Sequence, residues 1–478
     1  MSALAGIWNF DGRSDADSVC ARMLAAQAIY GPHADDRWDM GPIAMGRRLY
    51  RTLPEDIHDS QPLSGGDGRL VMVADVRLDN RDDLIGTLGI ATGAARLLAD
   101  SAVLLKAWER WQESCFDRLV GDYAFALWDK GTRSLVLARD PLGARPLHYH
   151  RGKTFLAFAS MPKGLHTLPE IPREPDEDRI TEHLALLPES GPQSFFKNVE
   201  RVEAGSYVIA TPGGLTSRLH WQPQRKTIKL AGADEYADAM REHLDRAVRA
   251  QLRGAGNTVG AHLSSGFDSS AVASSAAIQM ARTGGKVVAF TSVPRAGYSG
   301  PAPRGRHGDE GPAAARTAAR YPNMEHVLIR GGERSPLANL DRNFFLYDRP
   351  VLNLCNATWS NAINDAAQAR KLSVVLSGQM GNMSISFGGE MLLWELMRTG
   401  RWLKWAREGI GAVRKGHMRA LAVLNTTFGP SMPLPLWTWI NKVLEDRSTG
   451  IDSYAAINHT RLSEFDLEKR ARERALDL

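Results

Sequence analysis

Short apolar runs of strand length recur through the first half of the chain. Runs at 70–75, 124–128 and 134–138 are bounded by turn residues and predict buried strands. A further run at 207–210 is soon followed by Pro-Gly-Gly, which predicts a late hairpin. The pattern therefore predicts a sheet-rich α+β fold for this half.

The pattern changes after a polar segment with a proline at 221–231. Apolar residues at four-residue spacing then predict a helix from 236 to 252, with Asp234 as its N-cap. Beyond this helix, strand-like and helical segments alternate, which is typical of a parallel, doubly wound sheet. The expected strands are 259–263, 287–293, 326–329 and 372–376, and the expected helices are 269–282 and 310–320. We therefore predict domains at 1–220 and 232–478, joined by a linker at 221–231.

Composition narrows the class of protein. The 478 residues are too many for one core at about 150 residues per domain, and 43% apolar with 24% charged residues is typical of a globular chain. The formal charge of +5 comes from dispersed basic residues, so we expect an anionic ligand such as ATP rather than nucleic acid. Three cysteines give no disulfide framework or metal spacing. Without a signal-peptide pattern or an apolar run of about 18 residues, we expect a cytoplasmic protein that does not enter a membrane.

The candidate chemistry begins in the loop after the strand predicted at 259–263. The seven residues at 264–270 read Ser-Ser-Gly-Phe-Asp-Ser-Ser, and a helix rich in alanine and serine follows. Small residues let backbone N–H groups surround phosphate oxygens, and a helix N-terminus adds partial positive charge. Asp268 is unexpected beside an anion unless it holds a cation, so Mg²⁺ on a pyrophosphate is the natural ligand. A serine-rich helix cap without any ligand is the alternative.

This heptad resembles the Ser-Gly-Gly-x-Asp-Ser signature of ATP pyrophosphatases, which cleave ATP between the α and β phosphates. Other segments resemble the asparagine synthetase superfamily. Residues 121–129 and 138–147 are similar to signatures of its glutaminase domain, and 376–379 is similar to the second loop of its synthetase domain. The resemblance implies an α+β glutaminase-like domain (an Ntn-type sandwich), followed by an α/β doubly wound synthetase domain of the ATP-pyrophosphatase type that uses ATP and Mg²⁺.

The glutaminase signature lacks its nucleophile. Family members that hydrolyse glutamine begin with a processed N-terminal Cys followed by Gly-Ile, and here the matching tripeptide begins with Ala5. Covalent glutamine hydrolysis needs a thiolate, so we expect none. The family's Asn-Gly before its substrate loop is replaced by Ala74 and Asp75, which removes an expected oxyanion donor. Cys20 falls within a predicted helix and is not expected to replace the nucleophile, so this domain is expected to serve packing and stability.

If glutamine supplies no ammonia, the attacking amine must arrive with the substrate. One branch of the superfamily uses a single molecule as both carboxylate and amine, and it contains β-lactam synthetases and lasso peptide macrolactam synthetases, or lasso cyclases. The segments 349–356 and 376–386 resemble the lasso cyclases. That resemblance implies a precursor peptide as substrate, and a leader-binding protein and a leader peptidase as partners. The alternatives are another ligase of the superfamily, β-lactam synthetase-like or ammonia-dependent, and a non-catalytic peptide-binding pseudoenzyme.

The resemblance also implies roles for individual residues. A side-chain carboxylate of the precursor would be adenylated, and the peptide's N-terminal amine would then close an isopeptide ring. The residues expected to bind ATP are Ser264, Ser265, Gly266, Asp268, Ser269, Ser270, Thr291, Ser292, Val293 and Gly378. The expected catalytic residues are Asp268, Ser377, Gln379 and Asn382. Mg²⁺ is expected on Asp268 and on Asn382, which stands where the superfamily commonly has an Asp.

Three other features have more than one interpretation. The pair Asp309-Glu310 resembles the family's Asp-Glu at this point, although helix capping explains it equally well. The residues 347–349 are candidates for contact with the substrate peptide, or for an ordinary surface loop. The family's late Lys at the α-phosphate has no motif support at either Lys442 or Lys469.

Overall fold

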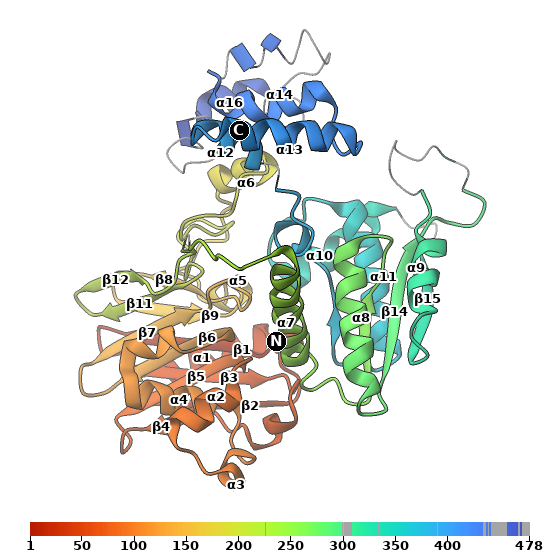
Figure 1. The fold of residues 1–478 in the computed structure, drawn as a ribbon. Helices are drawn as coiled ribbons and strands as arrows, with labels where there is room; N and C mark the ends of the chain where they lie inside the picture. The colour runs from red at the N-terminus through yellow and green to blue at the C-terminus, as the bar shows by residue number, and fades with distance from the viewer. Residues whose placement is uncertain are drawn as a thin grey trace. The chain divides into compact units, whose positions relative to one another are not determined.

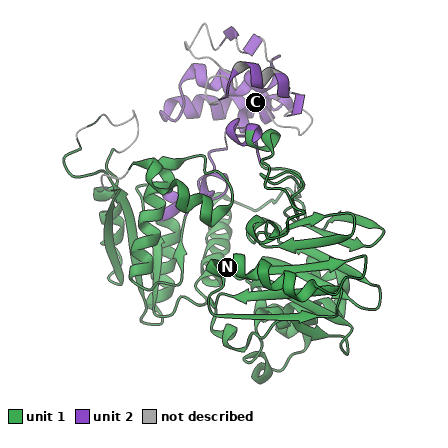
Figure 2. Ribbon diagram, turned by 180° about the vertical axis from the view of Figure 1, so that it is seen from behind, with its two compact units in different colours: residues 1–180, 189–265, 270–377 green, residues 181–188, 266–269, 378–478 purple. Residues whose placement is uncertain are grey.

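The computed structural model describes the chain except residues 225, 299, 301–307, 332–334, 390, 434–435, 438, 441–456, 467–468 and 471–478. Figure 1 shows the helices and strands, and the chain divides into two compact units, which Figure 2 distinguishes by colour. Unit 1 consists of residues 1–180, 189–265 and 270–377, and unit 2 of residues 181–188, 266–269 and 378–478. Unit 1 therefore contains both the sheet-rich half and the parallel sheet.

The sheet-rich half of unit 1 contains two antiparallel sheets. The first has the order β10 (Glu200–Arg201), β8 (His148–Arg151), β9 (Phe155–Ala159), β1 (Ala3–Asn9), β3 (Ile43–Leu49) and β2 (Ala34–Asp39). The second has the order β12 (Gly214–Leu219), β11 (Ser206–Thr211), β7 (Ser134–Arg139), β6 (Gly121–Asp129), β5 (Leu70–Leu78) and β4 (Leu63–Gly65). The strands predicted at 70–75, 124–128, 134–138 and 207–210 are confirmed within β5, β6, β7 and β11.

The helices of this half are short. They are α1 (Ala16–Ala26), α2 (Arg81–Leu88), α3 (Thr92–Ala95), α4 (Asp100–Trp111), α5 (Pro162–Leu165) and α6 (Glu177–Leu184), whose second half belongs to unit 2. Tight 3-10 turns are η1 (Ala28–Tyr30), η2 (Pro54–His58) and η3 (Gln112–Asp117).

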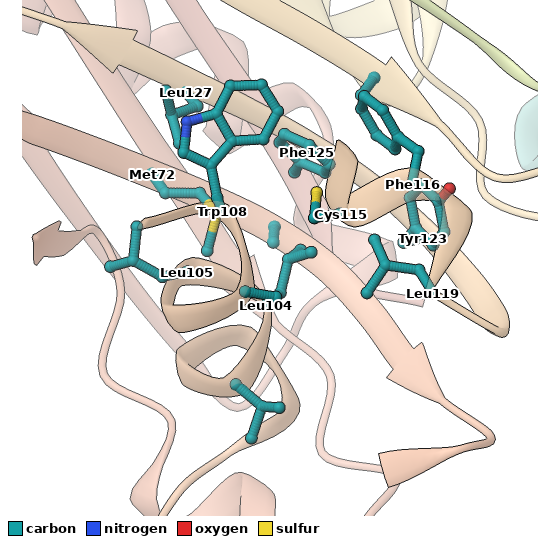
Figure 3. Packing of buried hydrophobic residues seen from close by; sticks show 14 of the residues in the cluster. Met72, Leu104, Leu105, Trp108, Cys115, Phe116, Leu119, Tyr123, Phe125 and Leu127 are labelled. Atoms are coloured by element: carbon teal, nitrogen blue, oxygen red, sulfur yellow. The ribbon is translucent and has the colours of Figure 1, made fainter. Parts of the chain in front are cut away.

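The side-chain alternation of the strands builds three apolar layers. In β1, Leu4 and Trp8 face the second sheet, while Ala5 and Ile7 face α1. In β5, alternate residues likewise divide between the first sheet and α4. Figure 3 shows the layer on α4, where Trp108 packs with aromatic and aliphatic side chains of the second sheet. The result is a helix–sheet–sheet–helix sandwich.

The rest of unit 1 is built on a parallel sheet. Its order is β15 (Met324–Arg330), β14 (Lys286–Val293), β13 (Thr258–His262) and β16 (Val375–Leu376). The helices and turn around it are α7 (Ala233–Gln251), α8 (Phe267–Ala281), α9 (Gly311–Ala318), η4 (Pro336–Asn339), α10 (Leu340–Tyr347) and α11 (Leu354–Ala369). The predicted order, an α+β half followed by an α/β half with parallel strands, is confirmed.

Two local predictions in this half differ from the structure. The N-cap of α7 is Gly232, in an extended conformation, and not Asp234 as predicted. Asp234 lies within the first turn of this helix. The strand predicted at 372–376 pairs only at its last two residues. Ser373 instead donates its hydroxyl proton to the carbonyl of Gly254, 2.7 Å away, so the segment before the pairing is held by a side chain.

Unit 2 is helical. Its main elements are α12 (Leu392–Arg398), α13 (Trp402–Arg414), α14 (Ala420–Phe428) and α16 (His459–Phe465), with 3-10 turns η5 (Gly381–Met383) and η6 (Gly429–Ser431). The indole N–H of Trp405 donates to the Thr427 hydroxyl at 2.9 Å, which joins α13 to α14. In the part of the chain that the structure describes, no helix has the length and apolarity needed to cross a bilayer.

Candidate functional site

The heptad at 264–270 lies at the carboxyl end of the central strand of the parallel sheet. Strand β13 ends at His262 and helix α8 begins at Phe267. Because the strands of this sheet are parallel, their carboxyl ends share one edge, where ligands bind in doubly wound folds. The strand–loop–helix context that a pyrophosphate loop requires is therefore present.

The serines of the loop that belong to unit 1 are held by specific bonds. The Ser265 hydroxyl donates to the carboxylate of Glu310, 2.8 Å away, and the Ser270 hydroxyl donates to the Ser264 carbonyl at 3.3 Å. The neighbouring Asp309 carboxylate accepts from the Gly311 backbone N–H at 2.9 Å. Asp309 thus pairs with the first N–H of α9, while Glu310, the N-cap residue of that helix, fixes a serine of the loop. A role of this pair like that of the family's Asp-Glu stays a prediction.

The part of the loop in unit 2 is packed against glycines of the second loop. A Cβ atom at position 381 would overlap the carboxylate of Asp268, and one at position 378 would overlap the backbone of Asp268 and Ser269. Gly378 and Gly381 therefore permit a close approach that no other residue allows. The sequence analysis named Gly378 but missed Gly381, whose only signal was its place two residues after Gln379.

The carboxylate of Asp268 fits a bound cation. Among the described residues its Oδ1 atom is buried and has no hydrogen-bond partner. A buried carboxylate oxygen without a partner is costly, and a divalent cation removes that cost. The described residues hold no group of three or more His, Cys, Asp or Glu arranged for a metal. Mg²⁺ needs no such group, since one or two carboxylates and the phosphates of a nucleotide commonly hold it.

The other residues predicted in the second loop are open to solvent. Ser377 and Gln379 are exposed, and Asn382 is exposed within η5, next to Gly381. Their catalytic roles, and the role of Asn382 as a second metal ligand, stay predictions. The lysine at position 442 lies outside the described residues, while Lys469 is exposed.

The end of strand β14 holds the residues predicted to contact adenine or ribose. Thr291 is buried, and its hydroxyl donates to the Leu263 carbonyl at 2.7 Å and lies 2.8 Å from Nε2 of His326. Burial lowers the pKa of His326, which favours a neutral imidazole beside this hydroxyl. Val293 is also buried, while Ser292 is half-buried. A nucleotide contact at this strand end would therefore use Ser292 and the backbone.

The position of the missing glutaminase nucleophile is sealed inside a sheet. Ala5 is fully buried in β1, and its backbone pairs with both neighbouring strands. The strand continues upstream of it, and the Ser2 N–H donates to the Asp75 carboxylate at 3.1 Å. That carboxylate also pairs with Arg145 at 3.5 Å. Asp75, which replaces a residue of the family's Asn-Gly, is therefore occupied by contacts within the chain.

Cys20 does not supply a replacement thiolate. It lies in α1, is fully buried, and its thiol lies 3.6 Å from the Ala5 carbonyl oxygen, to which it donates. Burial raises the pKa of this thiol to about 12, so it stays protonated at neutral pH. Neither Ala5 nor Cys20 provides a nucleophile for glutamine hydrolysis.

Two of the residues 347–349 contact another part of the same unit. The Asp348 carboxylate accepts a hydrogen bond from the Lys163 backbone N–H at 2.9 Å, and Arg349 forms an ion pair with Glu189 at 2.8 Å. Both partners belong to the sheet-rich half of unit 1. Asp348 and Arg349 thus join two parts of the unit, and a contact of 347–349 with the substrate peptide stays a prediction.

The chain matches two sequence families in succession. Residues 1–221 match the glutamine amidotransferase domain, and residues 239–469 match asparagine synthase. Asparagine synthetase (glutamine-hydrolyzing) 3 of Bacillus subtilis is 28% identical over 261 residues, which cover 54% of this chain and 42% of that protein. Amidase chyE of Penicillium rubens is 25% identical over 371 residues, covering 73% and 52%. The chain spans about half the length of the curated relatives it matches.

Proposed function

Because this chain belongs to the asparagine synthetase superfamily, we propose that it is an ATP- and Mg²⁺-dependent amide ligase that closes a macrolactam ring in a precursor peptide, as lasso cyclases do. One contrast carries the proposal. The amidotransferase domain has Ala5 at the expected nucleophile position, whereas the synthetase domain keeps Asp268, whose buried oxygen lacks a partner among the described residues. An enzyme of this kind activates a carboxylate with ATP but takes no ammonia from glutamine.

The proposed reaction has two steps. A carboxylate oxygen of an Asp or Glu side chain in the peptide attacks the α-phosphorus of ATP, the bond to the β-phosphate oxygen breaks, and pyrophosphate leaves. The neutral N-terminal amine of the same peptide then attacks the acyl carbon, the bond to AMP breaks, and the amine loses a proton. The peptide gains an isopeptide bond and becomes lighter by one water.

The residues of this chain supply binding and orientation for these steps. Asp268 would hold Mg²⁺, which neutralises charge on the departing pyrophosphate. Ser265, held by Glu310, would bind phosphate oxygens, and the first N–H groups of α8 would also do so. An N-terminal amine has a reference pKa near 8, so its deprotonation needs no strong base. Holding both ends of one peptide can lower the barrier by roughly 7–11 kcal/mol.

The source of the amine separates this proposal from ordinary asparagine synthesis. The Bacillus subtilis relative is described as glutamine-hydrolysing. In this chain, Ala5 is buried within a continuous strand, and the thiol of Cys20 has a pKa of about 12. These features support an amine carried by the substrate. The proposed partners are a leader-binding protein and a leader peptidase, which would deliver the precursor with a free N-terminus.

The test combines the whole chain, ATP, Mg²⁺ and a candidate precursor peptide with its partner proteins. We expect AMP to form together with a peptide product lighter by one water. Formation of AMP without that product would contradict the cyclase proposal, and a product that needs added ammonium salt would indicate the ammonia-dependent alternative. If neither AMP nor product forms, the pseudoenzyme is favoured.

A matched pair of variants links the reaction to the loop. Asp268→Asn should abolish AMP formation while the fold is retained. Asp365→Asn makes the same change in the same half of the chain, at an exposed ion pair with Arg342, and should keep full activity. Retained activity in Asp268→Asn would refute the assigned role of this carboxylate.

A further inference from the structure

The C-terminal end of helix α10 is capped by residues of the sheet-rich half of unit 1. The last carbonyls of a helix have no donors within the helix. Here the Tyr30 hydroxyl donates to the Leu346 carbonyl at 2.7 Å, with the Phe345 carbonyl at 3.4 Å. The Lys163 ammonium also donates to the Phe345 carbonyl. A cation is favourable at this end of a helix because of the helix dipole.

Lys163 is itself enclosed by this contact. Its ammonium lies 4.9 Å from the ring centre of Tyr30, 4.3 Å from that of Phe345, and 3.6 Å from the Asp348 carboxylate. The side chains of Lys163 and Asp348 are only 15% and 14% exposed. The backbone N–H of Lys163 donates to the same carboxylate. Every donor in this contact belongs to Tyr30 or Lys163, and the acceptors are two backbone carbonyls and the Asp348 carboxylate.

A second contact follows immediately along the chain. Arg349 forms two bonds with the Glu189 carboxylate, at 2.9 and 2.8 Å, and its guanidinium lies 5.6 Å from the ring centre of Phe195. The same carboxylate accepts from Arg201 in β10 at 2.9 Å. The segment 345–349 is therefore held at consecutive residues by the sheet-rich half.

This segment leads directly into helix α11. Only residues 350–352 separate it from Asn353, the N-cap of α11, whose side-chain oxygen accepts from the Asn356 N–H at 2.9 Å. Helix α11 packs through Ile363, in its second half, on Phe290 of β14. A displacement at Asp348 would thus be passed on to the start of α11.

We propose that Tyr30 and Lys163 are positioning residues of the synthetase half, through which the domain without a nucleophile holds the 345–353 segment in its working conformation. The catalytic part of this inference rests on the proposed function. This contact would give the Ala5-containing domain a role that does not depend on glutamine hydrolysis. The expected consequence is a defect in the peptide-dependent step, because the segment includes residues 347–349, which are candidates for contact with the substrate peptide.

The test uses the double variant Tyr30→Phe/Lys163→Met, which keeps the aromatic ring and the side-chain length but removes both donors. Lys163→Arg keeps the charge. The control Lys197→Met removes an ion pair with Glu174 in the same half of the unit. Hydrogen exchange, which needs no activity, is followed at the amides of Asp348 and Ala357; these donate to the carbonyls of Phe344 and Asn353.

We expect exchange at 345–357 to rise roughly 3- to 10-fold in the double variant, the range expected for a lost hydrogen bond, and to be unchanged at β13–β15. The single variant Lys163→Arg, which retains Tyr30 and the positive charge, should keep most of the protection against exchange. With an active wild type, the KM for peptide should rise by a similar factor while the KM for ATP stays within about twofold. Unchanged exchange, or a rise spread evenly over the parallel sheet, would overturn the inference. If the wild type makes no AMP, the proposed function fails, but the exchange result still decides the contact.

Discussion

The carboxylate of Glu310, at the start of α9, accepts a hydrogen bond of 2.8 Å from the hydroxyl of Ser265 in the candidate pyrophosphate loop. This contact fixes the hydroxyl of a loop serine from outside the loop. It predicts that Ser265→Ala and Glu310→Ala each raise the KM for ATP by about 10-fold, the upper range for one hydrogen bond. Because the two residues act through one contact, the double variant should be little worse than the poorer single variant.

The control for this cycle is the neighbouring Asp309. Asp309→Ala removes the bond to the Gly311 N–H and should lower the stability of α9 by about 1 kcal/mol. The effects of Asp309→Ala and Ser265→Ala on the KM for ATP should be additive when both are expressed as free energies. Additive behaviour of the Ser265 and Glu310 variants would contradict the predicted coupling.

The close approach of Gly381 to Asp268 gives a second prediction. Gly381→Ala should push the Asp268 carboxylate aside, because the added Cβ overlaps it. A displacement of about 1 Å can cost roughly 100-fold in rate, so AMP formation should fall by at least that factor. Gly411→Ala in α13 adds a Cβ into open space and should leave the rate unchanged. Equal rates in the two variants would show that the overlap does not matter.

The reaction of the cysteines with a thiol reagent tests whether the interior of the amidotransferase domain is closed to solvent. Cys20 and Cys115 are buried, and burial raises the pKa of each thiol to about 12, whereas Cys355 is exposed. A thiol reagent should therefore modify one cysteine in the native protein and three after unfolding. Rapid native modification of Cys20, identified by mass spectrometry, would contradict this prediction.

Restoring the nucleophile should not restore glutaminase activity. Ala5→Cys places a thiol in the middle of a paired strand, with Ser2 and Asp75 already bonded to each other. We expect no glutamate from glutamine in either the wild type or this variant. Measurable glutaminase activity in Ala5→Cys would mean that the pocket is still open to glutamine.

The pH dependence of stability should follow His148. Burial lowers the pKa of this imidazole to about 3, and its Nδ1 lies 2.8 Å from the Ser160 carbonyl oxygen. The unfolded chain takes up a proton below about pH 6.5, while the folded chain does so only near pH 3. The contribution of neutral His148 to the free energy of unfolding is therefore complete above about pH 6.5. It is lost as the pH falls toward 3, at up to about 1.4 kcal/mol per pH unit.

Urea unfolding at pH 7.5 and 5.5 checks this slope. His148→Asn should reduce the loss of unfolding free energy between the two values by about 1 kcal/mol, whereas the exposed His58→Asn should not. An unchanged slope in His148→Asn would show that other groups set the acid sensitivity.

Much of the fold could be predicted because its signals are local. The strands at 70–75 and 134–138 are apolar runs between turns, and the serine-rich loop joins a strand to a helix as expected. The cap of α10 could not be predicted, since Tyr30 and Lys163 lie 316 and 182 residues from their carbonyl partners. No periodicity or propensity in the sequence reports such a pairing.

The candidate site was predicted unevenly for the same reason. Asp268 stands out as an acid within an anion-binding pattern, which is a local anomaly. The need for glycine at 381 depends on how closely the second loop approaches Asp268, and only the structure shows that approach. Thr291 was placed correctly at a strand end, but its hydroxyl bonds with Leu263 and His326 depend on neighbouring strands.

The measurement that tests the central claim most directly is the molar ratio of AMP to dehydrated peptide in one reaction with ATP, Mg²⁺, precursor and partner proteins, without glutamine or ammonium. The account predicts one AMP for each peptide that loses a water, with both products absent in Asp268→Asn and both retained in Asp365→Asn. AMP formed without a dehydrated peptide, or a peptide product that appears only when ammonium is added, would contradict it.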